Sequence, residues 1–151
     1  MKKEKMNDKG FSLVELIIVI AIMAVLVVVL APQYLKYVER PRNSTDLSNA
    51  TSMATALQVY AADPEANPGF LKNDQIVITV DSDGGTVTTT TTGTDTTAGA
   101  KALSEAAITI GDVKCKSKTN WDTYTITATV QPDGSLKFEY SPAAFKTAMT
   151  K

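Results

Sequence analysis

An uninterrupted apolar run near the N-terminus constrains this 151-residue chain more than any other feature. From Phe11 to Ala31 there are 21 residues, and only Ser12 and Glu15 among them carry polar side chains. At a helical rise of about 1.5 Å per residue the run spans roughly 32 Å, which matches a hydrocarbon core about 30 Å thick. The sequence therefore predicts a helix that can cross a membrane.

The residues around the run indicate its orientation. The ten residues before it, MKKEKMNDKG, hold four lysines and two acids. Positive charge before an apolar run favours a cytoplasmic N-terminus, so the rest of the chain is expected outside the cytoplasm. A removable secretory signal fits less well, because Ala31 is followed by Pro32, a poor place for the small-residue cleavage that such a signal needs.

The acid inside the run, Glu15, needs an explanation of its own. A carboxylate in an inserted segment costs up to about 3 kcal/mol on insertion scales and usually has a function. Glu15 either makes a specific interaction or sits close enough to the membrane surface to be tolerated. Length and composition leave both alternatives open.

Composition narrows the classes of function. The chain has no histidine and one cysteine, Cys115, so it cannot form an intrachain disulfide, and a zinc site or a Ser-His or Cys-His nucleophile is essentially excluded. The formal net charge of −1 gives no basic excess that would point to nucleic acid. No paired-acid, metal or nucleotide motif occurs at a useful spacing. An enzyme, a cofactor and a small-molecule substrate are therefore not expected.

The string KGFSLVELIIVIAIMAVL resembles the N-terminus of type IV pilins. In that family a short basic leader ends in Gly, the next residue is usually Phe, and a Glu lies four positions beyond it. Gly10, Phe11 and Glu15 occupy these positions, while Ser12 stands where Thr is commoner. The resemblance covers roughly 30 residues and is specific, because charge, Gly, aromatic, acid and apolar run all fall at fixed spacing.

The resemblance implies a processing pathway. Residues 1–10 would be a leader that a prepilin peptidase removes by cutting between Gly10 and Phe11, after which the new Phe11 amine is methylated. In a filament of bundled helices, that amine on one subunit and Glu15 on its neighbour would pair. At about 4 Å and an effective dielectric of about 20 the attraction is about 4 kcal/mol before desolvation, so we interpret the pair as setting register and docking.

Helical spacing continues beyond the apolar run. Residues 32–62 are expected to extend the helix as an amphipathic segment, because one stripe holds Leu47, Ala50, Ala54, Leu57 and Ala61. Pro32 and Pro41 cannot continue the hydrogen-bond ladder, so a kink is expected at each, and the alternative is a helix that ends at Pro32. The resemblance adds that related pilin helices can melt near the position of Pro32 on assembly.

Residues 63–151 are expected to form a globular, β-rich head. The stretch DPEANPG stops the helix with two prolines and a glycine, and QIVITV at 75–80 is a predicted strand. The clearest strand pair is TYTITATV and LKFEY, joined by the turn QPDGS. Apolar residues alternate along both strands, and those expected to face inward are Tyr124, Ile126, Ala128, Val130, Leu136, Phe138 and Tyr140. The predicted fold class is α+β and pilin-like: a long kinked N-terminal helix whose C-terminal half packs on a small antiparallel sheet.

Shorter motifs in the head allow narrower predictions. DSDGG is a tight turn rather than a calcium loop, because position 12 of such a loop would be Thr92 instead of Glu. Residues 98–110 predict a short helix with one face formed by Ala102, Leu103, Ala106 and Ile110. The Thr-rich stretch TVTTTTTGTDTTAG leaves a strand, a loop and an O-glycosylation site open. Asn43 and Asn49 fit N-x-[ST], a motif too frequent by chance to assign a function.

The single thiol has two interpretations. Lys114, Lys116 and Lys118 flank Cys115 and could lower its pKa, but a structural thiol is favoured. Trp121 is expected in the core or at its rim, and Met53, Leu57 and Tyr60 in ordinary core. Gram-negative pilins commonly staple their C-terminal region with a disulfide. The departure from that pattern favours a Gram-positive, clostridial kind of pilin or an anaerobic source.

The leading hypothesis is a structural subunit of a type IV pilus, used for adhesion or motility. The chain would first be a single-pass membrane protein with its head outside, and would then join an extracellular filament. Its partners would be further copies of itself, the prepilin peptidase and methylase, and the pilus assembly platform in the membrane. The alternatives are a pseudopilin of a type II secretion or DNA-uptake apparatus and a membrane-anchored binding module that never polymerises.

Overall fold

The computed structural model describes residues 10–63, 65, 70–91, 93 and 95–151. The expected leader, up to residue 9, lies outside the described residues, as do most of the DPEANPG helix stop and Thr92. The chain divides into two compact units, Met1–Val38 and Glu39–Lys151, which are described separately below.

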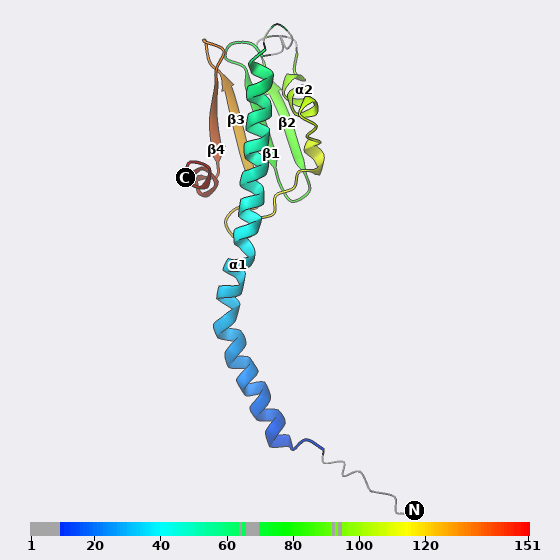
Figure 1. Cartoon of the computed structure of the whole chain (residues 1–151), viewed down its shortest axis with the longest axis vertical. Coiled ribbons are helices and arrows are strands. Elements are labelled where there is room, and N and C mark those ends of the chain that lie inside the picture. The colour runs from blue at the N-terminus through cyan, green and yellow to red at the C-terminus, as the bar shows by residue number, and fades with distance from the viewer. Residues whose placement is uncertain (1–9, 64, 66–69, 92, 94) are drawn as a thin grey trace, which may run out of the picture. The chain divides into compact units, whose positions relative to one another are not determined.

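The elements follow the order of an α+β fold (Figure 1). A long helix, α1 (Leu13–Ala61), precedes the strands β1 (Gln75–Val80) and β2 (Gly85–Thr90). The remaining elements are α2 (Ala98–Glu105), the 3-10 turn η1 (Ile110–Asp112), β3 (Tyr124–Val130), β4 (Leu136–Ser141) and α3 (Ala143–Met149). This order confirms the predicted fold class, a long N-terminal helix with an antiparallel sheet.

The four strands form one antiparallel sheet in the order β2-β1-β3-β4. β1 is central and pairs on both sides, so that Ile78 lies opposite Val87 of β2 and opposite Ile126 of β3. β3 and β4 form the predicted hairpin, with Ala128 opposite Phe138. The turn between them needs Gly134 at a φ of 85°, a left-handed conformation that glycine adopts without strain.

The part of α1 that belongs to the second unit packs across one face of this sheet (Figure 1). Its buried apolar residues meet the inward side chains of β1 and β3, since alternate strand residues point to the same face. From the helix the core takes Ala50, Met53, Ala56, Leu57 and Tyr60, and from the two strands Ile76, Ile78, Val80, Tyr124, Ile126, Ala128 and Val130. Leu136, Phe138 and Tyr140 of β4 are half-buried against it, as their alternation predicts.

α2 lies against β1 and β2 at very short range. The N–H of Gly99 donates a hydrogen bond to Thr89 Oγ1 at 3.0 Å, and a Cβ at this position would lie 2.7 Å from Ile76 Cγ2. Only glycine fits such a contact without displacing the helix. The Thr-rich stretch, which the sequence left open, therefore begins as the edge strand β2 and ends as a helix docked on the sheet.

One expectation about helices was wrong, and one alternative is excluded. The prediction of a helical face that includes Ala106 and Ile110 fails, because α2 ends at Glu105, Ala106 is exposed and Ile110 begins η1. The alternative of a helix that stops at Pro32 also fails, because α1 continues through both Pro32 and Pro41. Neither proline interrupts the helix, and the kink at each stays a prediction.

Candidate functional site

The first unit presents an apolar surface without a protein cover. From Leu13 to Leu30 every large apolar side chain is between 46% and 74% exposed. α1 is long and apolar enough to cross a membrane by length and composition, with a mean hydropathy of 3.4 over its most apolar 18 residues. An exposed apolar surface of this extent is covered by lipid or by other chains in a working protein.

The predicted acid at the start of this surface caps its own helix. The N–H of Ser12 donates a hydrogen bond to a Glu15 carboxylate oxygen at 2.8 Å, and α1 begins one residue later, at Leu13. This is half of a capping box, in which the third helical residue satisfies the backbone donor of the cap. Glu15 thus has an intrachain partner that our sequence analysis missed, although the S-x-x-E spacing of Ser12 and Glu15 carries the signal.

The cap does not exhaust the hydrogen-bonding capacity of Glu15. A carboxylate has two oxygens and about four lone-pair sites, and Ser12 uses one of them. The side chain is exposed in the isolated chain. A second donor from another subunit can therefore reach it, and its pairing with a neighbour's Phe11 amine stays a prediction.

The predicted cleavage junction lies just outside the helix. Gly10 and Phe11 have no helical assignment, Phe11 is 89% exposed, and a Cβ at Gly10 would meet no atom within 4 Å. No other described residue covers the junction at Gly10 and Phe11. A larger residue at Gly10 would not disturb the packing of the chain itself.

A second polar site, which the sequence analysis missed, lies in the compact unit Glu39–Lys151. Asp46 of α1 is fully buried and accepts hydrogen bonds from the backbone N–H groups of Lys116 at 2.8 Å and Ser117 at 2.9 Å. The indole N–H of Trp121 donates to the same carboxylate at 3.0 Å, and the Cys115 thiol lies 3.5 Å away. Asp46 thereby fixes the segment that leads into β3.

Glu39, which lies two helical turns before Asp46 in α1, binds the same segment. It accepts hydrogen bonds from the Ser117 hydroxyl and the Lys118 N–H, each at 3.1 Å, and pairs with Arg42 at 2.9 Å. Burial raises the pKa of Glu39, but the hydrogen bonds from Arg42, Lys118 and Ser117 outweigh it and leave the pKa below the ordinary value of 4.5. We call Glu39, Asp46 and residues 115–121 the acid clip.

Cys115 lies buried within the acid clip, with its thiol against Asp46. Its thiol is buried, and burial together with the nearby charge of Asp46 raises its pKa to about 12. The expectation that the flanking lysines could lower this pKa was wrong, because Lys114, Lys116 and Lys118 point outward to solvent while the thiol faces Asp46. The thiol is structural, as the sequence analysis favoured.

A sequence signal for the clip existed. Glu39 and Asp46 fall seven residues apart and continue the buried helix stripe that runs through Ala50, Met53, Leu57 and Tyr60. Acids on the inward stripe of a helix are rare, because a buried carboxylate is costly unless donors surround it. Their position predicts donors from another part of the chain, but not which part.

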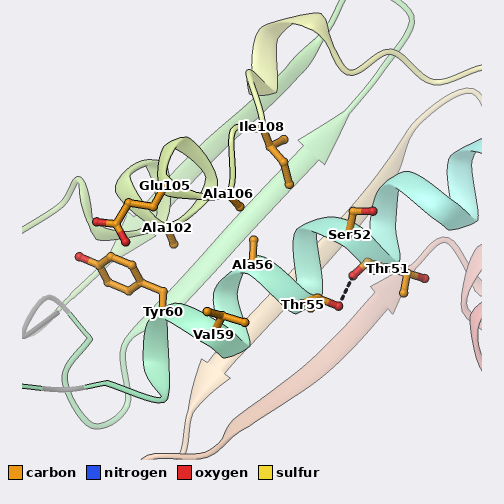
Figure 2. A pocket seen from close by; sticks show the side chains of 10 residues that line it. All are labelled: Thr51, Ser52, Thr55, Ala56, Val59, Tyr60, Ala102, Glu105, Ala106 and Ile108. Carbon is orange, nitrogen blue, oxygen red and sulfur yellow. Dashed lines mark hydrogen bonds between the residues drawn. The ribbon is translucent and has the colours of Figure 1, made fainter. Parts of the chain in front are cut away.

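An open groove of about 630 Å³ separates α1 from α2 (Figure 2). Its walls mix small, hydroxyl and apolar side chains, and Tyr60 and Glu105 lie at one end of it with Ile108 at the other (Figure 2). Within the described ranges of the chain, no three His, Cys, Asp or Glu side chains gather where they could hold a metal ion.

Comparisons with known proteins match the N-terminal part of the chain. Residues 5–31 match the family described as the prokaryotic N-terminal methylation motif. Three curated relatives, each a type IV major fimbrial protein FimA of Dichelobacter nodosus, are 39% identical over 59 residues. The similar region is 39% of this chain and 37–38% of each relative, so the chain matches less than two-fifths of their length. No solved structure matches.

Proposed function

We propose that this chain is a structural protein of the type IV pilin family and the repeating subunit of a type IV pilus, because its N-terminal part matches the prokaryotic N-terminal methylation motif and is similar to type IV major fimbrial proteins. The observation that carries the proposal is the apolar first half of α1, exposed along its whole length and beginning beside Phe11 and Glu15. Such a surface needs lipid before assembly and other subunits after it.

The proposed division of labour follows the chain. Residues 1–10 are the leader, 11–31 the membrane and filament-core helix, 32–62 its amphipathic continuation, and 63–151 the head. Prepilin peptidase cuts between Gly10 and Phe11 and the Phe11 amine is methylated. The helix then waits in the membrane, with its N-terminus in the cytoplasm and the head outside, until the assembly platform adds the subunit to the filament.

Glu15 has two proposed roles at successive stages. In the membrane it caps its own helix through Ser12, which lowers the cost of holding a carboxylate among apolar residues. In the filament it also accepts a hydrogen bond from the methylated Phe11 amine of a neighbouring subunit. A pair of this kind fixes register more than it adds stability, because desolvation offsets much of the Coulomb attraction.

The sheet supports a pilus over a pseudopilus. Its solvent face carries hydroxyl side chains on three neighbouring strands, while the apolar core, α1 and α2 lie on the opposite face. The threonines of this face, exposed or half-buried, are Thr79, Thr86, Thr88, Thr90, Thr125, Thr127 and Thr129. A polar, hydrated face of this kind suits a long fibre in solvent.

The test is to shear filaments from source cells and to measure the intact mass of their main polypeptide. The proposal expects filaments built mainly of this chain, starting at Phe11 and carrying one methyl group. Filaments seen only on overproduction would favour the pseudopilin, and a cleaved chain found only in membranes would favour the non-polymerising anchor. A chain that keeps Met1, or one cut after Ala31, would contradict the processing step.

Gly10→Leu separates cleavage from folding. Since a side chain at this position meets nothing in the chain, the variant should fold and insert normally while the uncut precursor accumulates in the membrane. Ser12→Thr is the matched control, because threonine also caps a helix and should be processed as the native chain is.

A further inference from the structure

Three exposed lysines form a row on the acid clip. Lys114, Lys116 and Lys118 are exposed and alternate with the buried Cys115 and Ser117. In an extended segment, side chains two residues apart point to the same side at a spacing of about 6.7 Å. In the segment KCKSK, Cys115 and Ser117 are thus buried and hold the segment in place, while the three lysines form a row of cations exposed to solvent.

The clip makes this row rigid. The N–H groups of Lys116 and Lys118 donate to Asp46 and Glu39, both on α1, and the N–H of Cys115 donates to the Asp81 carbonyl at 2.7 Å. The backbone of Lys116 and Lys118 is therefore anchored to the helix, and Cys115, next to Lys114, is anchored to the residue that follows β1. Little backbone entropy remains to be lost when a partner binds them.

The row lies at one end of the compact unit Glu39–Lys151, where β1 finishes and β3 begins. Three further exposed cations belong to this end: Arg40, Lys146 and Lys151. Arg40 and Lys151 line one recess there, beside Trp121. Three exposed carboxylates lie at the same end. Asp112 precedes the row in the sequence, Asp122 follows it, and Asp83 lies in the β1–β2 turn. Exposed cations therefore outnumber exposed acids, and we call this the basic end.

The opposite end of the same unit carries acids. There Ala61, the last residue of α1, and Ala62 after it line one recess with Gly134 and Ser135 of the β3–β4 turn. Its exposed carboxylates include Asp63, Glu65 and Asp133. Its exposed cations include Lys72 and Lys101, of which Lys101 pairs with the half-buried Asp95 of its own chain at 2.7 Å. We call this the acidic end.

We infer that the row of Lys114, Lys116 and Lys118 docks on Asp63, Glu65 and Asp133 at the acidic end of a second copy of this chain. The inference rests on the proposed function, and it names which surfaces of two heads meet. Two different ends of one molecule make a heterologous contact, which generates an open filament when its rotation does not close a ring. The occupant is a second copy because the complementary charges belong to the same chain, one set at each end.

The charges act on the choice of partner and on register. Exposed ion pairs contribute little affinity each, but complementary potentials speed encounter and juxtaposed like charges reject a wrong register. The apolar helices supply most of the affinity between subunits. Reversal of one end should therefore slow or misdirect assembly rather than unfold the head.

The experiment uses two triple variants of the full chain in the source cells. The basic-end reversal is Lys114→Glu, Lys116→Glu and Lys118→Glu, and the acidic-end reversal is Asp63→Lys, Glu65→Lys and Asp133→Lys. Each alone should lower the mass of sheared filaments about tenfold, as three lost weak pairs would. Both reversals in one chain should restore the yield, and so should co-expression of the two singly reversed chains, because each supplies the end that the other needs.

Controls keep the result readable. Lys101→Gln with Lys137→Gln removes two exposed lysines, on α2 and β4, that pair with Asp95 and Glu139 of their own chain, and it should assemble as the native chain does because exposed ion pairs contribute little. Native emission from Trp121, which lies in the clip, verifies that each variant folds. Normal filaments from both single reversals would overturn the inference. So would a loss that neither the combined variant nor co-expression restores, which would assign the lysines to another target such as lipid. Absence of filaments from the native chain would overturn the proposed function, and this inference with it.

Discussion

Trp121 donates its indole N–H to the buried carboxylate of Asp46 across 3.0 Å, although the two residues are 75 positions apart in the chain. The same indole meets Phe145 of α3 edge to face at 5.0 Å, and Phe145 stacks on Tyr124 of β3 at 4.4 Å. The Trp121 side chain thus takes part both in a hydrogen bond to an acid of α1 and in an aromatic cluster. Because Trp121 is the only tryptophan in the chain, its fluorescence reports the state of both.

Asp46→Ala should destabilise the compact unit by about 3 kcal/mol. The change leaves the N–H groups of Lys116, Ser117 and Trp121 without their acceptor, and each buried unsatisfied donor costs about 1–3 kcal/mol, part of which water entering the site offsets. Denaturant unfolding of the detergent-solubilised chain, followed by Trp121 emission, measures the loss. Asp83→Asn, in an exposed turn, should stay within about 0.5 kcal/mol of the native value. Equal stability of Asp46→Ala and Asp83→Asn would contradict the clip.

Glu39 predicts a dependence of stability on pH. Its pKa in the folded chain lies below its ordinary value of 4.5, so its contribution is present above about pH 4.5 and is lost as the pH falls through the folded pKa. The difference in unfolding free energy between the native chain and Glu39→Gln should therefore shrink on acidification. Glu105→Gln, exposed on α2, should keep the pH slope of the native chain. A constant difference between native chain and Glu39→Gln from about pH 6 to about pH 3 would show that the carboxylate is not held by these bonds.

Cys115 should resist thiol reagents while the chain is folded. Burial and the charge of Asp46 raise its pKa to about 12, and the thiolate is the reactive form. Labelling by a maleimide near neutral pH should be about a thousandfold slower in the native chain than in denaturant. Asp46→Ala should speed the native reaction, because it opens the clip around the thiol. Equal rates in native and denatured chain would refute the buried assignment.

The sequence predicted what local pattern controls. Gly10, Phe11 and Glu15 are recognisable because they match the N-terminal spacing of type IV pilins, and the strict alternation from Tyr124 to Val130 allows one orientation of the strand about the core. The β3–β4 turn follows from Gly134, which supplies the left-handed conformation. The roles of Gly10, Phe11 and Glu15 in cleavage and assembly remain predictions.

The features it missed depend on partners far along the chain. Asp46 is tolerated in the core because Lys116 and Ser117 bring donors to it from 70 and 71 residues away, which no local pattern encodes. Thr86 to Thr90 form a strand because β1 offers them a pairing edge, while their composition suits a loop equally well. The short helix α3 is fixed by Phe145, whose buried ring packs on Tyr124 and Trp121.

A fragment that starts at Tyr34 should be soluble, monomeric and folded. The compact unit begins at Glu39 and contains the whole core, while the apolar surface that needs lipid or other subunits ends before Tyr34. Sedimentation measures its mass, and thermal unfolding followed by Trp121 emission should show one cooperative transition. A fragment that starts at Asn49 is the matched comparison. It lacks both acids of the clip and should melt at a lower temperature. Aggregation or a gradual melt of the Tyr34 fragment would show that the head depends on the first unit.

Glu15→Ala should separate membrane insertion from assembly, because the two respond with opposite signs. Removal of the carboxylate eases insertion by up to about 3 kcal/mol, even though it also removes the cap on Ser12. In a filament it leaves a neighbour's Phe11 amine buried without its partner, a loss of about 3–5 kcal/mol. Cleaved Glu15→Ala protein should therefore accumulate in the membrane while surface filaments disappear.

Glu15→Gln separates the charge of Glu15 from its hydrogen bonds. A glutamine at the third helical position still accepts the Ser12 N–H, and it can accept a hydrogen bond from the amine without neutralising it. Its filament yield should lie between those of the native chain and Glu15→Ala. The measurement is the ratio of sheared filament to cleaved subunit in the membrane for all three chains. A native ratio in Glu15→Ala would reduce Glu15 to a helix cap and end the case for its pairing with Phe11.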